Sequence, residues 1–134
     1  MQNVTTLAHN KAIFRRFYED AWNSGDLALV DELLADDFVN RELPASMASQ
    51  SHRALYKQAI IETRAAFPDW RNTLEDMMAE GDRVAARWRS TGTRTGAAMQ
   101  EIPYGKLLAI SGITIVRVVD GKIAEFWKKD RHLT

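Results

Sequence analysis

The sequence predicts an α+β fold in which three N-terminal helices pack in the concave face of a curved, mostly antiparallel sheet. Apolar residues recur at helical spacing as far as Pro68, and after it they alternate with polar residues as in strands. Asp120-Gly121 stands between two strand-like runs and is a typical hairpin turn. The 134 residues contain no linker, repeat or low-complexity segment, so we expect a single domain over residues 1–134.

The helices are predicted from apolar stripes and from the residues at their ends. Residues 5–23 form the first helix, whose stripe consists of Leu7, Phe14, Phe17, Tyr18, Ala21 and Trp22. Gly25 suits the left-handed conformation that ends a helix, and Asp26 can accept the free amides of a second helix at residues 27–35. Ser51 caps a third helix, which Pro68 prevents from continuing.

The strands follow from alternation. A short strand at residues 36–44 carries Phe38 and Asn40 on one face. After Pro68, residues 69–78 form a longer strand, and a regular alternation puts its apolar residues on one face, namely Trp70, Leu74 and Met78. The turn Glu80-Gly81-Asp82 leads to the next strand, where Val84, Ala86 and Trp88 oppose Arg83, Arg87 and Arg89.

The strand at residues 107–119 is apolar on both faces and is therefore predicted to be central. One helix layer covers only one face of a sheet. The other face is expected to be buried against a second copy of the chain, which gives a two-fold homodimer. The hairpin then leads to a last strand at residues 122–129.

Composition excludes several classes of function. The 18 basic and 18 acidic residues give zero net charge, which predicts no attraction to nucleic acid or to an anionic membrane. No apolar run approaches the roughly 20 residues that span a bilayer, so no membrane partner is expected. The N-terminus lacks the features of a signal peptide and the chain has no cysteine, so a cytoplasmic location is the simplest expectation. The three histidines are scattered, and no metal site is predicted.

Polar residues on faces that otherwise look buried are the candidates for a site. By alternation these are Asn40, Asn72, Asp76, Ser90 and Glu125. A buried polar group is costly unless it is paired, so several that converge on one concave face indicate a ligand pocket. The alternative is that each of them satisfies a neighbouring main-chain group.

Aromatic residues could form the walls of that pocket. Together with Tyr18, the four tryptophans could line a cavity for a flat, mostly apolar molecule: Trp22, Trp70, Trp88 and Trp127. Filling of the core is the plainer interpretation of the same residues.

Five segments together resemble a known family. The strings AAFPDW, AEGDRVAARW, GTRTG, IPYGK and ISGITIVRVVDGKIAEFW occur in the order and spacing typical of SnoaL-like polyketide cyclases, over residues 10–130. The resemblance implies the cone-shaped α+β fold of the nuclear transport factor two superfamily. It also implies a homodimer packed through the open sheet and chemistry that needs no metal or cofactor. Because that superfamily contains cyclases, isomerases, hydrolases and non-catalytic binders, it implies function less narrowly than fold.

In the cyclases an aspartate of the last strand is the acid/base group, and Asp130 is the nearest match in this chain. The family has this aspartate four residues after the tryptophan, whereas Asp130 follows Trp127 by three. In a regular strand Asp130 would point away from Trp127, and a bulge would be needed to bring it back. Glu125 and Asp76 are the alternative carboxylates by alternation.

Two arginines occupy positions where the family often has histidine. Arg41 follows the asparagine of the first strand, and Arg94 follows Gly92-Thr93. At the mouth of a pocket they would favour an anionic ligand. The alternative is that both are charges on solvated loops.

The leading hypothesis is a small, cofactor-independent enzyme of the SnoaL-like type. It would catalyse a cyclase- or isomerase-type proton transfer on a small hydrophobic carbonyl compound, with Asp130 as acid/base and with Asn40 and Asn72 orienting oxygens. A second hypothesis is a non-catalytic ligand-binding or dimerisation module of the same fold. A third is an epoxide-opening hydrolase that uses Asp76 with Arg87. A carboxylate that faces an internal void would favour an enzyme.

Overall fold

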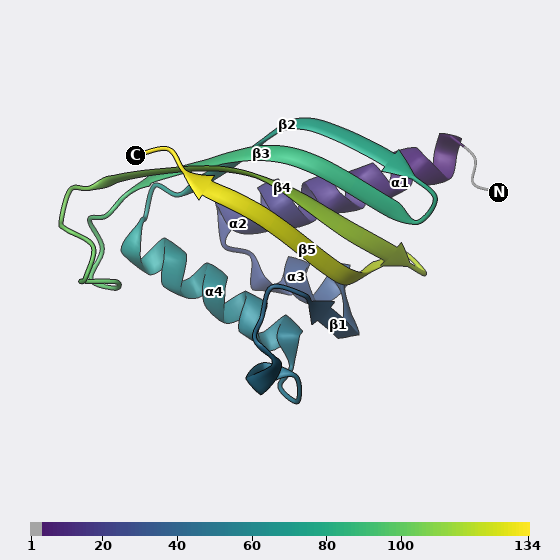
Figure 1. The fold of residues 1–134 in the computed structure, drawn as a ribbon, viewed down its shortest axis with the longest axis horizontal. Helices are drawn as coiled ribbons and strands as arrows, with labels where there is room; N and C mark the ends of the chain where they lie inside the picture. The colour runs from purple at the N-terminus through teal and green to yellow at the C-terminus, as the bar shows by residue number, and fades with distance from the viewer. Residues whose placement is uncertain (1–3) are drawn as a thin grey trace.

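The computed structural model describes residues 4–134 and confirms the predicted fold class: helices pack against one face of a curved five-stranded sheet (Figure 1). The first helical segment runs without a break through α1 (Val4–Arg15), a π-helical turn η1 (Arg16–Ala21) and α2 (Trp22–Ser24). It is followed by α3 (Leu27–Leu33), a 3₁₀ turn η2 (Ala45–Met47) and α4 (His52–Ala66). Among the described residues, no helix has the length and apolar character needed to cross a membrane.

The strand order in the sheet is β1-β5-β4-β3-β2. Only β1 runs parallel to its neighbour, and the other pairs are antiparallel. The strands are β1 (Leu34–Asn40), β2 (Arg71–Glu80), β3 (Arg83–Thr93), β4 (Leu107–Val119) and β5 (Lys122–His132). We call the side that packs on the helices the inner face and the opposite side the outer face.

The helix ends form as the sequence predicts. Gly25 adopts a left-handed conformation with φ of 72°. Asp26 Oδ1 accepts hydrogen bonds from the amides of Ala28 (3.1 Å) and Leu29 (3.3 Å). Ser51 Oγ accepts one from Ala54 N (3.2 Å), which satisfies an amide that a helix otherwise leaves free.

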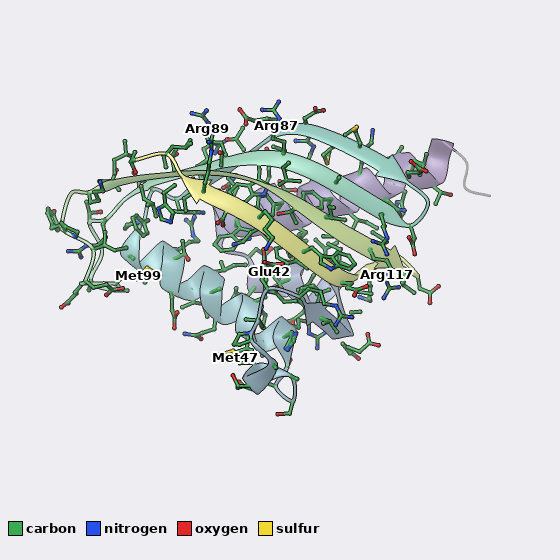
Figure 2. The ribbon with its side chains drawn as sticks, in the orientation of Figure 1. Glu42, Met47, Arg87, Arg89, Met99 and Arg117 are labelled. Atoms are coloured by element: carbon green, nitrogen blue, oxygen red, sulfur yellow. The ribbon has the colours of Figure 1, made fainter. Side chains whose placement is uncertain are left out.

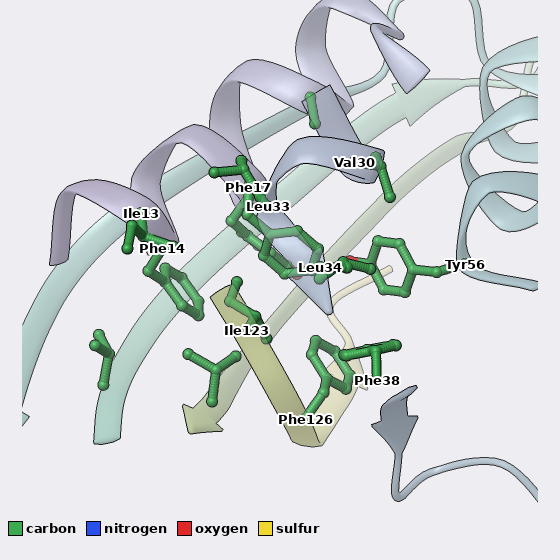
Figure 3. Packing of buried hydrophobic residues seen from close by; sticks show 14 of the residues in the cluster. Ile13, Phe14, Phe17, Val30, Leu33, Leu34, Phe38, Tyr56, Ile123 and Phe126 are labelled. Atoms are coloured by element: carbon green, nitrogen blue, oxygen red, sulfur yellow. The ribbon is translucent and has the colours of Figure 1, made fainter. Parts of the chain in front are cut away.

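The core lies between the helices and the inner face and is rich in aromatic side chains (Figure 3). Phe17 from the π-helical turn lies 5.0 Å from Tyr56 of α4, measured between ring centroids. Tyr56 in turn lies 5.7 Å from Phe126 of β5. These contacts join the first helical segment, α4 and the last strand, so they fix the distance between the helix layer and the sheet.

A bulge in β2 changes which residues face inward. The pairing of β2 with β3 slips between Leu74 and Asp76, so the alternation reverses after Leu74. Met77 therefore packs on the core, while Met78 lies on the outer face with 68% of its surface exposed. The prediction that Met78 and Asp76 share a face with Trp70 is wrong because a regular strand was assumed.

A second bulge occurs in β5. Arg117 of β4 pairs with Glu125, and the next residue, Val118, pairs with Ile123, so Ala124 is left without a partner. Beyond the bulge, the pairing is regular from Phe126 to His132. Ile123 therefore faces inward before the bulge and Phe126 faces inward after it, so Glu125 and Trp127 lie on the outer face.

Candidate functional site

A cavity of about 350 Å³ lies between α4, the first helical segment and the inner face of the sheet. Four of the predicted ligand-binding residues line it: Tyr18, Trp22, Asn40 and Trp70. Most of the remaining wall is apolar and comes from α4, β4, β5 and the loop of residues 94–106. We call this space the inner cavity.

The aromatic wall of the inner cavity carries a hydroxyl group that can donate to a ligand. Trp22 Nε1 donates to the Tyr56 hydroxyl oxygen (2.8 Å). Burial raises the pKa of Tyr56, so its hydroxyl stays protonated at any physiological pH. Since Tyr56 accepts from Trp22, its own proton can point to an oxygen in the cavity.

One side of the inner cavity is polar, and it is formed by Asn40, Glu42 and Lys128. Asn40 Oδ1 accepts from the Glu42 amide (2.9 Å), and Glu42 Oε2 accepts from the Lys128 amide (3.0 Å). These two bonds join the segment after β1 to β5. Glu42 lies on the helix side of the sheet, as does Met99 of the 94–106 loop (Figure 2).

Asp130 lies on the inner face beside this polar side. Its strand partner is Gly112, whose own β3 partner is the buried Trp88. An Asp130 carboxylate oxygen lies 3.2 Å from Lys128 Nζ. Asp130 thus forms an ion pair with a residue that lines the inner cavity, but Asp130 itself does not line that cavity. It also borders a hollow on the outer face, between Lys129 and Arg131.

No bulge near Lys128-Lys129 is needed to turn Asp130 inward, contrary to the expectation from the sequence. Trp127 lies on the outer face, where the Arg83 guanidinium sits 5.0 Å from its ring centroid. Because β5 is regular here, the odd spacing from Trp127 puts Asp130 on the inner face. The expectation was wrong because it took Trp127 to face inward, whereas Trp127 faces outward.

The absence of a side chain at Gly112 makes room for Asp130. A Cβ atom built on Gly112 would lie 2.6 Å from Trp88 Cζ2 and 2.9 Å from Asp130 Cβ. Both separations are shorter than side chains tolerate. Gly112 therefore lets the Trp88 indole and Asp130 lie side by side.

Tyr18 lies among the buried polar groups, near enough to Asp130 to feel its charge. Its side chain is only 5% exposed, and its hydroxyl is hydrogen-bonded to the side chains of Thr114 and Ser90. Burial is the main cause that raises the pKa of Tyr18, and the charges of Tyr56 and Asp130 add to it. Tyr18 is therefore a neutral phenol in the cavity wall.

Asn72 lies behind the wall rather than in it. Its side chain donates from Nδ2 to the Tyr18 main-chain carbonyl (3.0 Å) and accepts at Oδ1 from Trp70 Nε1 (2.9 Å) and Ser90 Oγ (2.6 Å). Tyr18 lies in the π-helical turn. There its carbonyl accepts a hydrogen bond from the Asn72 side chain and not from the main-chain amide four residues on, as it would in an α-helix. Asn72 and Ser90 hold the first helix on the sheet, and neither lines the inner cavity.

Four other predicted site residues also lie away from the inner cavity. Trp88 is buried behind it and donates from Nε1 to Thr114 Oγ1 (2.9 Å). Trp127, Glu125 and Asp76 lie on the outer face as a result of the two bulges. Asp76 and Arg87 are strand partners, but Arg87 forms its ion pair with Glu75 (3.3 Å), so the predicted Asp76–Arg87 arrangement does not form.

Glu125 is part of a structural ion cluster. It accepts from Arg41 Nε (2.6 Å) and Arg117 Nε (2.9 Å). The hydrogen bond from Arg117 is the largest of the causes that lower the pKa of Glu125, and Arg41 adds to it. Glu125 is thus held as a carboxylate on the outer face.

Neither arginine at the family's histidine positions lines the inner cavity. Arg41 is bound to Glu125. Arg94 is buried, donates to the main-chain carbonyls of Ile102 (2.9 Å) and Gly96, and lies over the Tyr104 ring. The alternative of two solvated loop charges is therefore wrong for Arg94, which holds the 94–106 loop in shape.

Sequence reasoning missed Lys128, Glu42 and the loop residues Met99 and Ile102 of the inner cavity. Lys128 follows Phe126 by two residues, so the two share a face of the strand. Taking Phe126 as an inward-facing residue would have predicted that Lys128 faces inward as well. Glu42 follows the end of β1, and the loop residues follow no periodic pattern. Their positions carried no signal in the sequence.

Comparison with known proteins agrees with this geometry. The sequence profile of the SnoaL-like polyketide cyclases matches residues 12–130. IdmH from Streptomyces antibioticus, named a candidate polyketide cyclase, has 31% identity and a TM-score of 0.74, with 90% of this chain and 91% of that chain covered. AclR from Streptomyces galilaeus, named a candidate hydroxylase, has 29% identity and a TM-score of 0.76, with 93% and 76% covered.

A candidate polyketide cyclase from Bacillus cereus has 29% identity and a TM-score of 0.74, with 91% of this chain and 74% of that chain covered. No curated protein sequence matches the chain significantly. The similar structures thus carry two different names for their activity, cyclase and hydroxylase, on one fold.

Proposed function

Because this chain belongs to the SnoaL-like polyketide cyclase family, we propose that it is a small enzyme that transfers a proton on a hydrophobic carbonyl compound held in the inner cavity. The observation that carries the proposal is the carboxylate–ammonium pair of Asp130 and Lys128 at the polar side of an aromatic cavity. Asp130 is itself exposed to solvent, and a carboxylate beside an apolar cavity is suited to acid/base chemistry.

The proposed ligand is flat and largely apolar. Trp22, Trp70 and Tyr18 give the cavity broad aromatic walls, and its volume of about 350 Å³ lies within the range of small-molecule sites. The Tyr56 hydroxyl and the Asn40 amide would donate to carbonyl oxygens of the ligand. The sequence predicted that Asn72 orients a ligand oxygen. We assign this role to Tyr56, because the Asn72 amide is already hydrogen-bonded to other groups of the protein.

In the proposed reaction, the Asp130 carboxylate takes a proton from a carbon next to a carbonyl group. The electron pair of the broken C–H bond moves to the carbonyl oxygen, where the Lys128 ammonium stabilises the enolate. The enolate carbon then forms a C–C bond to a second carbonyl of the same molecule. The proton on Asp130 returns to the oxygen of that second carbonyl. Atoms and charge balance without an oxidant or reductant.

A non-catalytic binding module of the same fold is the competing function. It is favoured by one observation, namely that Asp130 stands beside the inner cavity and does not line it. A ligand would then fill the aromatic space, and the Lys128–Asp130 pair would only close its polar side.

Solvent exchange separates the two functions without knowledge of the natural substrate. The probe is 1-tetralone, a flat bicyclic ketone, and its deuterium uptake next to the carbonyl in D₂O is followed by NMR. We expect the protein to accelerate this exchange and Asp130→Asn to abolish the acceleration while leaving the melting temperature unchanged. Asp76→Asn and Glu125→Gln, which change carboxylates of the outer face, are matched controls and should keep the rate.

Two results would contradict the proposed enzyme. Full acceleration by Asp130→Asn would remove Asp130 from the reaction. Binding of 1-tetralone by the wild-type protein without any accelerated exchange would favour the binding module.

We also propose that the chain forms a homodimer through the outer face. Support comes from large apolar side chains that lie exposed there, Met78 at 68% and Ile113 at 53%. Light scattering at micromolar concentration should give twice the chain mass, and a monomer mass would contradict the proposal. The cytoplasmic location expected from the sequence stays a prediction, which cell fractionation checks.

A further inference from the structure

His52 joins the end of β1 to the start of α4 through both nitrogens of its ring. Its Nδ1 atom lies 3.0 Å from the Asn40 main-chain nitrogen, and its Nε2 atom lies 3.0 Å from the Met47 carbonyl oxygen. Because β1 is an edge strand, amides on its free side have no strand partner, and the Asn40 amide donates to His52 instead. We call these two hydrogen bonds the His52 clamp.

The two partners determine the protonation state of His52. The Asn40 amide can only donate, so Nδ1 must accept and carries no proton. The Met47 carbonyl can only accept, so Nε2 must carry a proton and donate it. Both bonds therefore form together only when the ring is neutral, with its proton on Nε2.

A protonated His52 would gain no ion pair. The titratable and charged groups on the elements around it are Asp31 of α3, Asp36 and Asp37 of β1, Arg41 and Glu42 after β1, and Arg53, Tyr56 and Lys57 of α4. Asp31 and Asp36 both pair with Arg53, at 3.6 Å and 2.7 Å. Among residues 4–134, no carboxylate lies within ion-pair distance of His52. Protonation would therefore break the bond from Asn40 without compensation.

The His52 clamp connects two walls of the inner cavity. Asn40, which the clamp holds by its main chain, lines the cavity from the end of β1. Leu55 and Tyr56 line it from α4, and they follow His52 by three and four residues on the same side of the helix. The position of Asn40 relative to the Tyr56 hydroxyl therefore depends on the clamp.

We propose that His52 is a positioning residue, which in its neutral form holds Asn40 in place to bind a ligand carbonyl and on protonation releases Asn40 and weakens binding in the inner cavity. Histidine side chains change charge between pH 5 and 8. Because the neutral form is the one that binds, affinity should be high at the upper end of this range and should fall as the pH falls. The proposal rests on the proposed function only in that a carbonyl compound occupies the inner cavity, and it does not require Asp130 to transfer a proton.

The first test follows the ligand-free protein by nitrogen–proton correlation NMR from pH 8 to pH 5.5. At pH 8 the His52 ring should be neutral, with its proton on Nε2. On acidification the Asn40 amide signal should shift together with the signals of the His52 ring. His52→Asn keeps a side-chain oxygen near the position of Nδ1 but does not titrate, so the Asn40 amide signal should stay constant in this variant.

The second test measures the affinity for 1-tetralone by isothermal titration at pH 8 and pH 5.5. The wild-type affinity should fall at least about fivefold at the lower pH, because only the fraction of protein with a neutral His52 is competent to bind. His52→Asn should bind at pH 8 within about threefold of the wild type and should lose the pH dependence. His52→Phe, which keeps a ring but has no acceptor, should bind at least about fivefold more weakly than the wild type at pH 8.

His9→Asn/His132→Asn is the control, because it removes the other two histidines, which are both exposed. It should keep the pH dependence of the wild type. Circular dichroism at both pH values checks that each variant is folded.

Three results would overturn the proposal. The first is an Asn40 amide signal that does not follow the His52 ring, or a ring with its proton on Nδ1 at pH 8. The second is the same pH dependence of affinity in His52→Asn as in the wild type, which would assign it to other groups. The third is an unchanged affinity in His52→Phe at pH 8. Failure of 1-tetralone to bind the wild type at pH 8 would instead contradict the proposed function, and the Asn40 amide titration would then decide whether His52 positions Asn40.

Discussion

The inner and outer faces of this sheet differ in how far their polar groups are buried and paired. On the inner face, Asn72, Ser90 and Thr114 are buried and hydrogen-bonded, and among the described residues no buried side-chain nitrogen or oxygen lacks a partner. On the outer face, Arg89 and Lys129 are exposed in the single chain and have no ion-pair partner among residues 4–134. Desolvation explains the difference, because a buried polar group must be paired whereas a hydrated charge need not be.

Both faces come from the same strands. In β3, Trp88 packs inward on Tyr18, with ring centroids 5.3 Å apart, while Arg87 and Arg89 on either side point outward. A substitution therefore has very different consequences at neighbouring positions. Buried polar residues of the inner face should matter more for stability than exposed charges of the outer face.

The largest effect is expected for Asn72→Ala. This change leaves the Trp70 indole, the Ser90 hydroxyl and the Tyr18 carbonyl without their partner. Each unsatisfied buried group costs about 1–3 kcal/mol, so the free energy of unfolding should fall by roughly 4 kcal/mol. Urea denaturation measures it.

Thr73→Ala is the matched control for Asn72, because Thr73 is the next residue and is exposed on the outer face. Its free energy of unfolding should change by less than about 0.5 kcal/mol. Equal losses in the two variants would mean that the two faces do not differ as described.

A smaller effect is expected for Gly112→Ala. The added methyl group would lie 2.6 Å from Trp88 Cζ2 and 2.6 Å from the Lys129 carbonyl oxygen, so β4 and β5 must shift apart. Overpacking of this kind costs about 2 kcal/mol. The same shift moves Asp130, so the exchange of 1-tetralone should slow as well. Ser111→Ala, the neighbour on the outer face, should change neither quantity.

The smallest effect concerns the ion cluster of Glu125 on the outer face. Because Arg117 and then Arg41 lower the pKa of Glu125, its stabilising effect is present above the unfolded-state pKa of about 4.3 and is lost as the pH falls through the lower folded-state value. Glu125→Gln should therefore reduce the free energy of unfolding by about 1 kcal/mol at pH 7 and by less at pH 3. Urea denaturation at the two pH values checks this, and a difference that grows towards pH 3 would contradict it.

The sequence predicted what depends on local periodicity and turn chemistry. Helix ends at Gly25, Asp26 and Ser51 follow from residue types whose conformations or side-chain acceptors are fixed by local chemistry. The hairpin at Asp120-Gly121 and the order of helices and strands follow in the same way. These features need no knowledge of tertiary contacts.

The candidate site was less predictable because bulges have no clear sequence signal. One extra residue in β2 moved Asp76 to the outer face, and one in β5 moved Glu125 and Trp127 there. Asn72 was predicted correctly to be buried, but only the structure identifies its partners, which lie far away in the sequence at Tyr18 and Ser90.

The central claim is that the ligand binds on the inner face and not on the outer one. The indole N–H signals of the four tryptophans report on this directly, because Trp22 and Trp70 line the inner cavity, Trp88 is buried behind it and Trp127 lies on the outer face. On titration with 1-tetralone, nitrogen–proton correlation NMR should show large shifts for Trp22 and Trp70 and none for Trp127. A shift confined to Trp127, or no shift at any of the four, would contradict the account.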